Sequence, residues 1–373
     1  MAFELMKRLG ISLVLVLLCR ISTANAAEIS VSVNNAPVDG VLVFQVYSNA
    51  NSFGDFRDPA REVRYPVQAT GSYVIDDVPA GAVAVLVYLD ENDNRALDKN
   101  FIGIPREPLG LSNNYRPKGP PSFKRASFVI QSGETVALDI GLYRVLGDSG
   151  QWGVGLGVIG RSSPYRDSNT NVSQVIPAVT YFGERLQWVG PELRYGLVGS
   201  DDLRLALTAS YRIGVYEEGD SPVLEGLGDR EDTLLAGLGL VYEAAGGVEL
   251  DLRYQHDVLD RIGGGAATLS ASKGFQLGIA RFSPRLGVNW LSDDLGNHDY
   301  GVPESAARPG RSAYSVDDSV SLEVGLRGLV ELSENWRVAI NFAVEYLDDE
   351  VTDSPIVDGD RVIKGFAALT YTF

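Results

Sequence analysis

The chain has very few of the residues that most often carry chemistry, with one cysteine and two histidines among 373 residues. The cysteine, Cys19, lies in an N-terminal segment that we expect to be removed, so the mature chain has no thiol and no disulfide. A zinc site built from clustered histidines and cysteines is therefore excluded. The fold must hold without covalent cross-links, even though the segment that contains Cys19 directs the chain to an oxidising compartment.

That N-terminal segment has the features of a secretory signal. Two basic residues precede an apolar run over residues 9–19, which is too short to cross a bilayer as a helix. A small-x-small pattern follows at Ala24-Asn25-Ala26. We therefore predict a signal peptide over residues 1–26, with cleavage after Ala26.

The rest of the chain lacks long apolar runs and lacks an excess of positive charge. No later segment has eighteen consecutive apolar residues, so helices cannot carry the chain through a membrane. The chain has 32 Lys and Arg against 49 Asp and Glu, a formal charge of −17, which argues against nucleic-acid binding. What is abundant is glycine, with 41 residues, and tyrosine, with 17. This composition favours β-structure with alternating faces.

Residues 27–144 have the pattern of a small β-domain, in which short apolar or alternating segments recur between turn sequences. The expected strands are 28–33, 41–47, 72–75, 82–89, 127–130 and 135–142. Residues 82–89 are apolar almost throughout, which is typical of a strand that is buried on both faces. The spacing favours an Ig-like antiparallel β-sandwich.

Residues 151–373 follow a different pattern after a short linker, residues 145–150. Segments of about ten residues alternate between polar and apolar positions, which is the length a tilted membrane strand needs. The expected strands are 151–160, 172–182, 185–189, 192–198, 202–215, 233–243, 247–258, 266–275, 280–291, 319–331, 335–347 and 361–373. Since every backbone polar group must be paired within lipid, the sheet must close. We predict a closed antiparallel transmembrane β-barrel of about 12 strands.

The lengths of the connections between these strands support the barrel. Most odd-numbered connections are long, such as residues 216–232 and 292–318, whereas the even-numbered ones are tight turns. Bacterial barrels combine long extracellular loops with short periplasmic turns. The short third connection, at Gly190-Pro191, is an exception. Because the first barrel strand enters from the short-turn side, we expect the N-terminal domain to lie in the periplasm.

The last strand carries a further signal. Leu369, Tyr371 and Phe373 alternate at the C-terminus, which resembles the sorting signature that outer-membrane proteins present to the barrel assembly machinery. One face of this strand suits lipid and lipopolysaccharide, and the other suits a polar lumen. Aromatic residues near strand ends are expected to form interfacial girdles, although ordinary packing in a soluble barrel would also place aromatics there. They are Trp152, Tyr181, Trp188, Tyr211, Tyr254, Trp290, Trp336, Tyr346 and Tyr371.

Residues from about 148 to 373 resemble the MipA/OmpV family of outer-membrane proteins. The matching segments are Tyr300-Gly301-Val302, residues 308–314, the Leu332-Ser333-x-x-Trp336 turn, residues 353–357, residues 224–229 and the closing Tyr371-Thr372-Phe373. The family is named for a protein that interacts with a murein-degrading transglycosylase and is thought to link it to a murein synthase. Other members look like adhesins or stress-responsive barrels. The resemblance therefore implies a non-enzymatic scaffold or surface role.

The N-terminal half, from about residue 28 to 142, resembles an uncharacterised secreted family numbered 2141 among the domains of unknown function. Residues 90–94, 97–98, 101–108, 110–114 and 120–123 carry this resemblance. It implies a domain boundary and no activity. An ordinary member of the barrel family lacks this additional domain.

One loop of the N-terminal half has calcium-like spacing. Asp90, Asn92, Asn94 and Asp98 supply oxygen atoms at loop positions one, three, five and nine, and calcium prefers six to eight oxygen ligands. Against this, Arg95 stands where a calcium loop of the EF-hand type has glycine. The alternative is a polar turn closed by Asx caps. A bound ion would be structural, bracing the excursion that follows.

The evidence for an enzyme is thin. His256 and His298 are each followed by an aspartate, Asp257 and Asp299. Neighbouring residues on a strand point to opposite sides, so adjacency in sequence does not make a catalytic pair. We assign no catalytic and no cofactor-binding residue and expect no cofactor, with a structural calcium at residues 90–98 left open as an alternative to the polar turn.

The sequence thus predicts an outer-membrane barrel that acts as an envelope scaffold and links murein hydrolases or synthases to the membrane. Tethering a periplasmic domain there would raise the local concentration of a weak partner. Two alternatives remain open. One is a small-solute channel or transporter, whose lumen the loop 292–318 would fold into and block. The other is a surface adhesin or an outer-membrane hydrolase.

Overall fold

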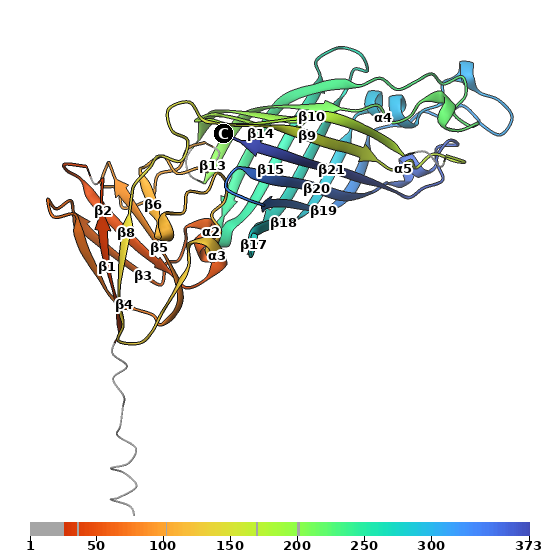
Figure 1. Ribbon diagram of the computed structural model, residues 1–373. Coiled ribbons are helices and arrows are strands. Elements are labelled where there is room, and N and C mark those ends of the chain that lie inside the picture. The colour runs from red at the N-terminus through yellow and green to blue at the C-terminus, as the bar shows by residue number, and fades with distance from the viewer. Residues whose placement is uncertain (1–25, 36, 102, 169–170, 200–201) are drawn as a thin grey trace, which may run out of the picture.

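A computed structural model describes residues 26–373, except residues 36, 102, 169–170 and 200–201. Residues 1–25 of the predicted signal peptide lie outside the described residues. Figure 1 shows a small β-domain at one end of a long, tilted barrel. The first strand begins at Ala27, directly after the predicted cleavage point. No helix among the described residues is long and apolar enough to span a membrane.

The N-terminal domain consists of two small sheets packed face to face. The first has the order β4 (Ser72–Val78), β1 (Ala27–Val33) and β8 (Thr135–Ile140). The second has the order β3, β2, β5 and β6, with β7 also paired to β5. Its strands are β2 (Val41–Tyr47), β3 (Arg61–Pro66), β5 (Gly81–Asp90), β6 (Leu109–Leu111) and β7 (Phe128–Ile130). The predicted β-sandwich is confirmed, with one departure, because β1 and β8 pair in parallel.

Strand β5 is buried on both faces, as its apolar run predicts. Val83, Val85 and Val87 belong to the core between the two sheets. Leu86 and Tyr88 point to the opposite face and pack beneath the short helices α2 (Ala50–Asp55) and α3 (Phe123–Ala126). The second core explains why no residue of the run is polar before Asp90. It also places both helices on the side of the domain that faces the barrel (Figure 1).

The barrel closes through its own first and last strands. Its order runs from β16 through β15, β14, β13, β12, β11, β10 and β9 to β21, β20, β19 and β18, and β18 pairs with β16. The strands are β9 (Gln151–Arg161), β10 (Val172–Phe182), β11 (Leu186–Val189), β12 (Glu192–Gly199), β13 (Leu203–Arg212), β14 (Thr233–Ala244), β15 (Val248–Asp257), β16 (Gly265–Lys273), β18 (Ala280–Leu291), β19 (Ser319–Glu331), β20 (Trp336–Tyr346) and β21 (Arg361–Thr372). The predicted twelve-stranded closed barrel is confirmed.

Two details of the barrel refine the sequence prediction. The short segments around Gly190-Pro191 are two strands, because β11 pairs with β12 as an antiparallel hairpin. The strand predicted to end at Phe275 is interrupted after Lys273, and its end forms β17 (Phe275–Leu277), which pairs with β18. The register of β17 continues that of β16, so the two form one interrupted strand.

The alternation of the strands sorts apolar residues to the outer surface and polar residues to the lumen. On β21, Ile363 and Leu369 are more than 40% exposed, whereas Thr370 and Thr372 are buried. Aromatic residues occupy both ends of the outer surface, with Trp152 and Trp336 near the short turns. This outer surface is the apolar band that a bilayer requires.

Candidate functional site: the barrel lumen and its two ends

The barrel encloses a cavity of about 770 Å³. Its lining extends from Phe101 and Pro120, which belong to the N-terminal domain, to Asp299 and Tyr300 in the long loop after β18. The lumen is therefore bounded by residues of the N-terminal domain at one end and by loop residues at the other. Small side chains such as Ala339 and Ala343 leave this space open.

The lining is strongly charged, and arginine predominates. Nine basic and five acidic side chains line the cavity in a chain whose formal charge is −17. The basic residues are Arg161, Arg194, Arg204, Arg212, Arg253, Arg281, Arg285, Arg327 and Lys364, and the acidic residues are Glu192, Glu249, Asp299, Glu323 and Glu345. The lumen wall thus has an excess of positive charge, although the chain as a whole is negative.

Most of these charges form ion pairs, some between neighbouring strands and others between strands that are not adjacent in the barrel. Arg285 Nη1 lies 3.0 Å from Glu323 Oε1, and Lys364 Nζ lies 2.6 Å from Glu345 Oε2. Arg194 Nη2 lies 2.6 Å from Asp251 Oδ2. Buried pairs of this kind are costly to break, since removal of one partner leaves the other charge uncompensated. They fix the lumenal side chains in place.

A packed lid of four long loops covers one end of the lumen. Its core joins residues from the connections after β9, β13, β18 and β20, among them Tyr165, Tyr216, Tyr300 and Val351. The rings of Tyr165 and Tyr216 meet edge to face, with centroids 4.7 Å apart. The loop 292–318, which we expected to fold into the lumen and block it, contributes helix α4 (Asp293–Tyr300) to this lid instead, and its residues Asp299 and Tyr300 line the cavity.

Asp299 holds the lid to the barrel wall. Its carboxylate pairs with Arg212 at the end of β13 and accepts a contact of 3.0 Å from His298 Nδ1. Burial acts to raise the pKa of Asp299, but Arg212 and His298 hold it well below its usual value. The side chain is therefore ionised at neutral pH, and the pair with Arg212 is a buried charge pair.

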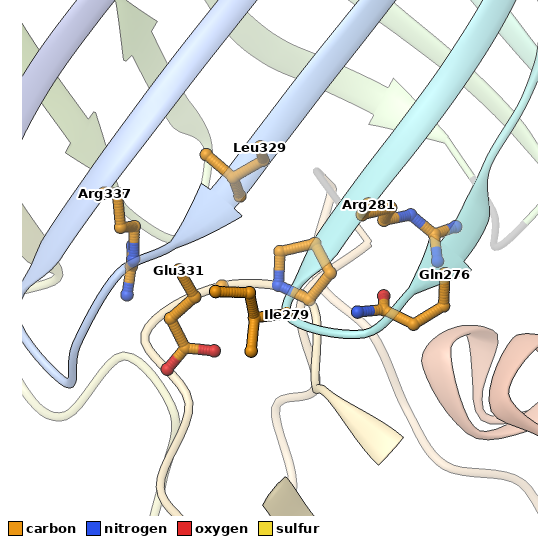
Figure 2. Close-up of a pocket in the computed structure, with 8 residues that line it drawn as sticks. Gln276, Ile279, Arg281, Leu329, Glu331 and Arg337 are labelled. Atoms are coloured by element: carbon orange, nitrogen blue, oxygen red, sulfur yellow. The ribbon is translucent and has the colours of Figure 1, made fainter. Parts of the chain in front are cut away.

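The N-terminal domain closes on the other end of the barrel, where the turns are short. Tyr115 donates a hydrogen bond of 2.5 Å to Glu331 Oε2, and Ser122 Oγ donates one of 2.8 Å to the carbonyl oxygen of Gly278. Asp55 at the end of α2 pairs with Arg281. Figure 2 shows Glu331, Arg281 and their neighbours around this mouth.

Further contacts surround this mouth on several barrel turns. They are Asn100 with Gly183, Arg106 with Glu184, Arg57 with Glu243, Gln276 with Asn51, and Lys118 with Thr372. Phe101 lies so close to β12 that a methyl group at Gly196 would stand 2.1 Å from its ring carbon Cγ. The domain is thus docked on the barrel by polar contacts around a rim and by a ring inserted at the mouth.

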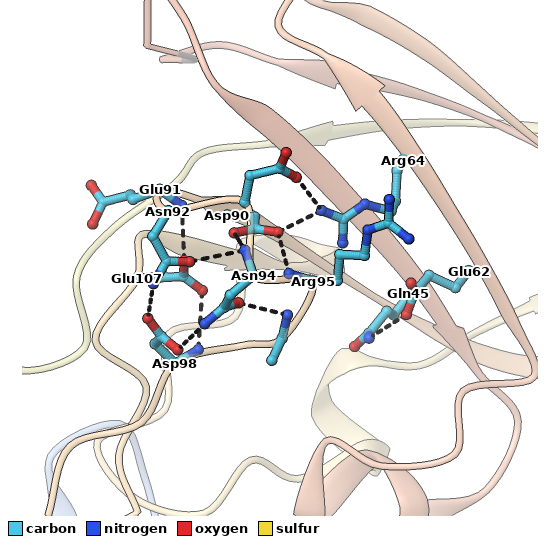
Figure 3. A network of polar contacts seen from close by, with 12 residues as sticks. Gln45, Glu62, Arg64, Asp90, Glu91, Asn92, Asn94, Arg95, Asp98 and Glu107 are labelled. Atoms are coloured by element: carbon cyan, nitrogen blue, oxygen red, sulfur yellow. Dashed lines mark hydrogen bonds and ion pairs between the residues drawn. The ribbon is translucent and has the colours of Figure 1, made fainter. Parts of the chain in front are cut away.

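The predicted calcium loop is held together by contacts among its own residues (Figure 3). Asn92 and Asn94 each donate an amide hydrogen bond of 2.7 Å to the two carboxylate oxygens of Asp98. Asp90 accepts from Arg64 at 2.5 Å and from the backbone N–H of Arg95 at 3.0 Å. Burial acts to raise the pKa of Asp90, but Arg64 and the backbone donors hold it below its usual value. No group of three or more acidic, histidine or cysteine side chains able to hold a metal occurs among the described residues.

Calcium binding by this loop stays a prediction. The contacts described above determine what an experiment with calcium should show. An ion would require Asn92 and Asn94 to turn their carbonyl oxygens inward and to give up both hydrogen bonds to Asp98. We expect the melting temperature of the full chain to be the same in calcium and in EGTA, because Arg64 and the amides already satisfy the carboxylates. A saturable rise in calcium that is abolished in Asp98→Asn would instead support the calcium loop.

The two histidines occupy different settings. His256 lies on the exposed side of β15, and Asp257 is buried on the other side, as strand alternation predicts. His298 does contact Asp299, because both lie on helix α4 rather than on a strand. The partner of that aspartate is Arg212, so the arrangement is an ion-paired structural contact.

Comparisons with known proteins agree with both halves. Residues 154–373 match the model of the family described as MltA-interacting protein MipA, and residues 31–137 match DUF2141, an uncharacterised family conserved in bacteria. Both resemblances predicted from the sequence motifs are confirmed.

Individual relatives match the barrel half. The outer membrane protein YiaT of Escherichia coli K12 is 27% identical over 223 residues, which are 59% of this chain and 90% of YiaT. The MltA-interacting protein of the same organism is 30% identical over 59% of this chain and 89% of its own length. OmpV of Vibrio cholerae is 25% identical over 60% and 87%. Among solved structures, an outer membrane channel of Pseudomonas putida F1 is 13% identical, with a TM-score of 0.31 over 60% of this chain and 95% of that channel.

Proposed function

The chain belongs to the MipA family of outer-membrane proteins, and on that premise we propose that it is a non-enzymatic envelope scaffold. In this proposal the barrel anchors the chain in the outer membrane, and the N-terminal domain presents a surface to a murein-remodelling enzyme. The relatives named above are outer membrane proteins, and none has an enzyme name.

The observation that carries the proposal is an uncovered sheet face on the N-terminal domain. The sheet of β4, β1 and β8 packs its apolar side chains against the second sheet, and its other side is open. That open side carries mainly small or acidic residues, such as Ser32, Ser72 and Asp139, and all three are exposed. It lies away from the barrel, on the far side of the domain from α2 and α3 (Figure 1).

The position of the domain supports a partner in the periplasm. The domain contacts the short turns of the barrel, at Gly183, Glu243, Gly278 and Glu331. Short turns are the periplasmic turns of bacterial outer-membrane barrels, and the murein layer lies on that side of the membrane. The polar docking contacts restrict the orientation of the domain, which favours presentation of one face.

The class of partner comes from a relative. One similar protein is named for interaction with MltA, a murein transglycosylase. A partner bound to a domain that is fixed on the membrane has a raised effective concentration near the murein, even when each contact is weak.

Site-specific photocrosslinking in intact cells tests the scaffold. A photoreactive amino acid at Ser32 or Thr135, on the open sheet face, is expected to capture a murein hydrolase or synthase. The same probe at Val320, which is 47% exposed on the outer surface of the barrel, is the control and is expected to capture none. Recovery of no murein enzyme from either sheet position would contradict the proposal.

A second candidate function is solute passage, which the lumen of about 770 Å³ favours. The lid covers one end of the lumen and the docked N-terminal domain covers the other, and both argue against the passage of solutes. We expect the full chain to show no stable conductance in planar bilayers, because residues from both ends line the lumen. Stable ohmic channels in the unmodified protein would reverse this preference.

A further inference from the structure

A row of polar side chains crosses three strands of the lumen wall without using its hydrogen-bonding groups. Ser283 on β18 stands directly opposite Arg327 on β19, which stands opposite Asn341 on β20. All three line the cavity. None of the three side chains makes a hydrogen bond or ion pair to any residue that the structure describes.

The acidic residues of the lumen are already engaged with other cations. Glu323 pairs with Arg285, and Glu345 is held by Lys364 at 2.6 Å and by Ser321. Asp251 pairs with Arg194. Arg327 therefore has no acidic side chain within ion-pair distance among the described residues, and its guanidinium presents five N–H donors without an acceptor there.

Further donors and charge converge on the same space. Arg285 lies two residues from Ser283 on the same face of β18, and its Nε–H is buried without a partner among the described residues. Glu192, on the distant strand β12, lies within electrostatic range of both Arg285 and Arg327. Charges from separate parts of the wall thus act on the same part of the lumen.

Arg327 is half-buried beside the cavity, and the buried Nε–H of Arg285 without an acceptor is energetically unfavourable. If the role of Arg327 were only structural, we would expect an acidic partner beside it, because the small neighbouring side chains leave room for one. Arginine presents a planar fork that matches carboxylate and phosphate oxygens. Phe366 on β21 stands opposite Asn341 and gives the row an apolar end.

We propose that the lumen is a binding site for a small organic anion that carries a carboxylate or phosphate group. Arg327 and Arg285 bind the oxyanion, Ser283 and Asn341 donate to it, and Phe366 contacts its apolar part. A cavity of about 770 Å³ has the size of a small-molecule site. The floor of the site is the docked N-terminal domain, because Gly119 lies against Leu329, two residues from Arg327.

The test is isothermal titration calorimetry on the purified full chain in a neutral detergent at low salt. The probes are citrate, for the carboxylate source, and inorganic phosphate. We expect saturable binding of at least one probe at one site per barrel. Arg327→Gln is expected to weaken that binding about tenfold or more, because a charge-assisted hydrogen bond is lost. Arg361→Gln, at the exposed start of β21, is the matched control and keeps the wild-type affinity.

The outcomes separate the alternatives. Binding of citrate alone identifies a carboxylate ligand, and binding of phosphate alone identifies a phosphate ligand. Melting of the unliganded proteins separates ligand binding from a structural role, since Arg327→Gln removes an unpaired charge and should not lower the melting temperature. Absence of saturable binding, equal affinity in Arg327→Gln, or a lower melting temperature of that variant with no loss of affinity would overturn the proposal.

Discussion

Cysteines introduced together at Gly54 and Gln276 are expected to form a disulfide in nearly all of the mature protein without added oxidant. A Cβ atom at Gly54 would lie 3.8 Å from Cβ of Gln276, which is the usual separation in a disulfide. The bond would join α2 of the N-terminal domain to β17 of the barrel. Non-reducing electrophoresis and mass spectrometry of the linked peptides measure it, and Cys19, the only native cysteine of the sequence, lies in the predicted signal peptide.

The matched control pairs Gly54→Cys with Arg361→Cys. Arg361 begins β21, and Thr372, the last residue of that strand, contacts the N-terminal domain through Lys118. Eleven residues of extended strand separate them by about 35 Å, so this pair should stay reduced. If the Gly54 and Gln276 cysteines also stayed reduced in an oxidising buffer, the docked arrangement would be wrong.

Replacement of Asp299 by asparagine is expected to release the lid. Asp299 is 1% exposed and pairs with Arg212, which would be left as an uncompensated charge at the lumen. Loss of one partner of a buried pair costs about 3–5 kcal/mol, so the open lid should become more populated by about a hundredfold or more. Arg311, which is buried in the lid, then becomes accessible, and the rate of tryptic cleavage after it measures the opening.

The pH dependence of the same measurement follows from the pKa of Asp299. Its value in the folded protein is lowered from 3.8, so the contribution of the carboxylate to lid stability is complete well above that pH. The contribution declines only as the pH falls below 3.8 and through the lower folded pKa. The wild-type lid should therefore stay closed at pH 5, measured with an acid-tolerant protease. Asp294→Asn, an exposed acid of the same helix, is the control and should cleave like the wild type.

The barrel could be predicted closely because its alternation continues along most of each strand. Strands β18 and β19 were predicted with both ends correct, since lipid contact demands an apolar residue at every second position. The prediction was wrong where alternation fails. Gly274 interrupts the strand before β17, and its Cβ position is occupied by the guanidinium of Arg281.

The N-terminal domain was harder to predict because two of its strands have weak patterns. Strand β3, Arg61–Pro66, was missed because it is charged and ends in proline, as edge strands do. Strand β6 has only three residues and is buried throughout, so it shows no alternation. The parallel pairing of β1 with β8 depends on tertiary packing, and no local sequence feature reports it.

One part of the lumenal site could have been predicted from the sequence, and another part could not. Alternation shows that Arg285 and Arg327 point inward, so an arginine-rich lumen could have been inferred from the sequence. The register between neighbouring strands decides which arginine has no acidic side chain beside it. A register shift of two residues would place each arginine next to a different partner. The docking residues Tyr115 and Glu331 are separated by 216 positions, and each looks like an ordinary polar residue.

The pairing of first strand with last in each half has a consequence for biogenesis. β1 pairs with β8 inside the N-terminal domain, and β9 pairs with β21 inside the barrel. In each half the first strand is therefore paired with the last strand of the same half. The domain can finish folding once residue 145 has crossed the inner membrane, whereas the barrel cannot close until its last strand is delivered. Domains fold as units, N-terminal first. The folded N-terminal domain would then reach the outer membrane together with barrel strands that have not yet closed. The short turns could dock on this domain while the barrel inserts.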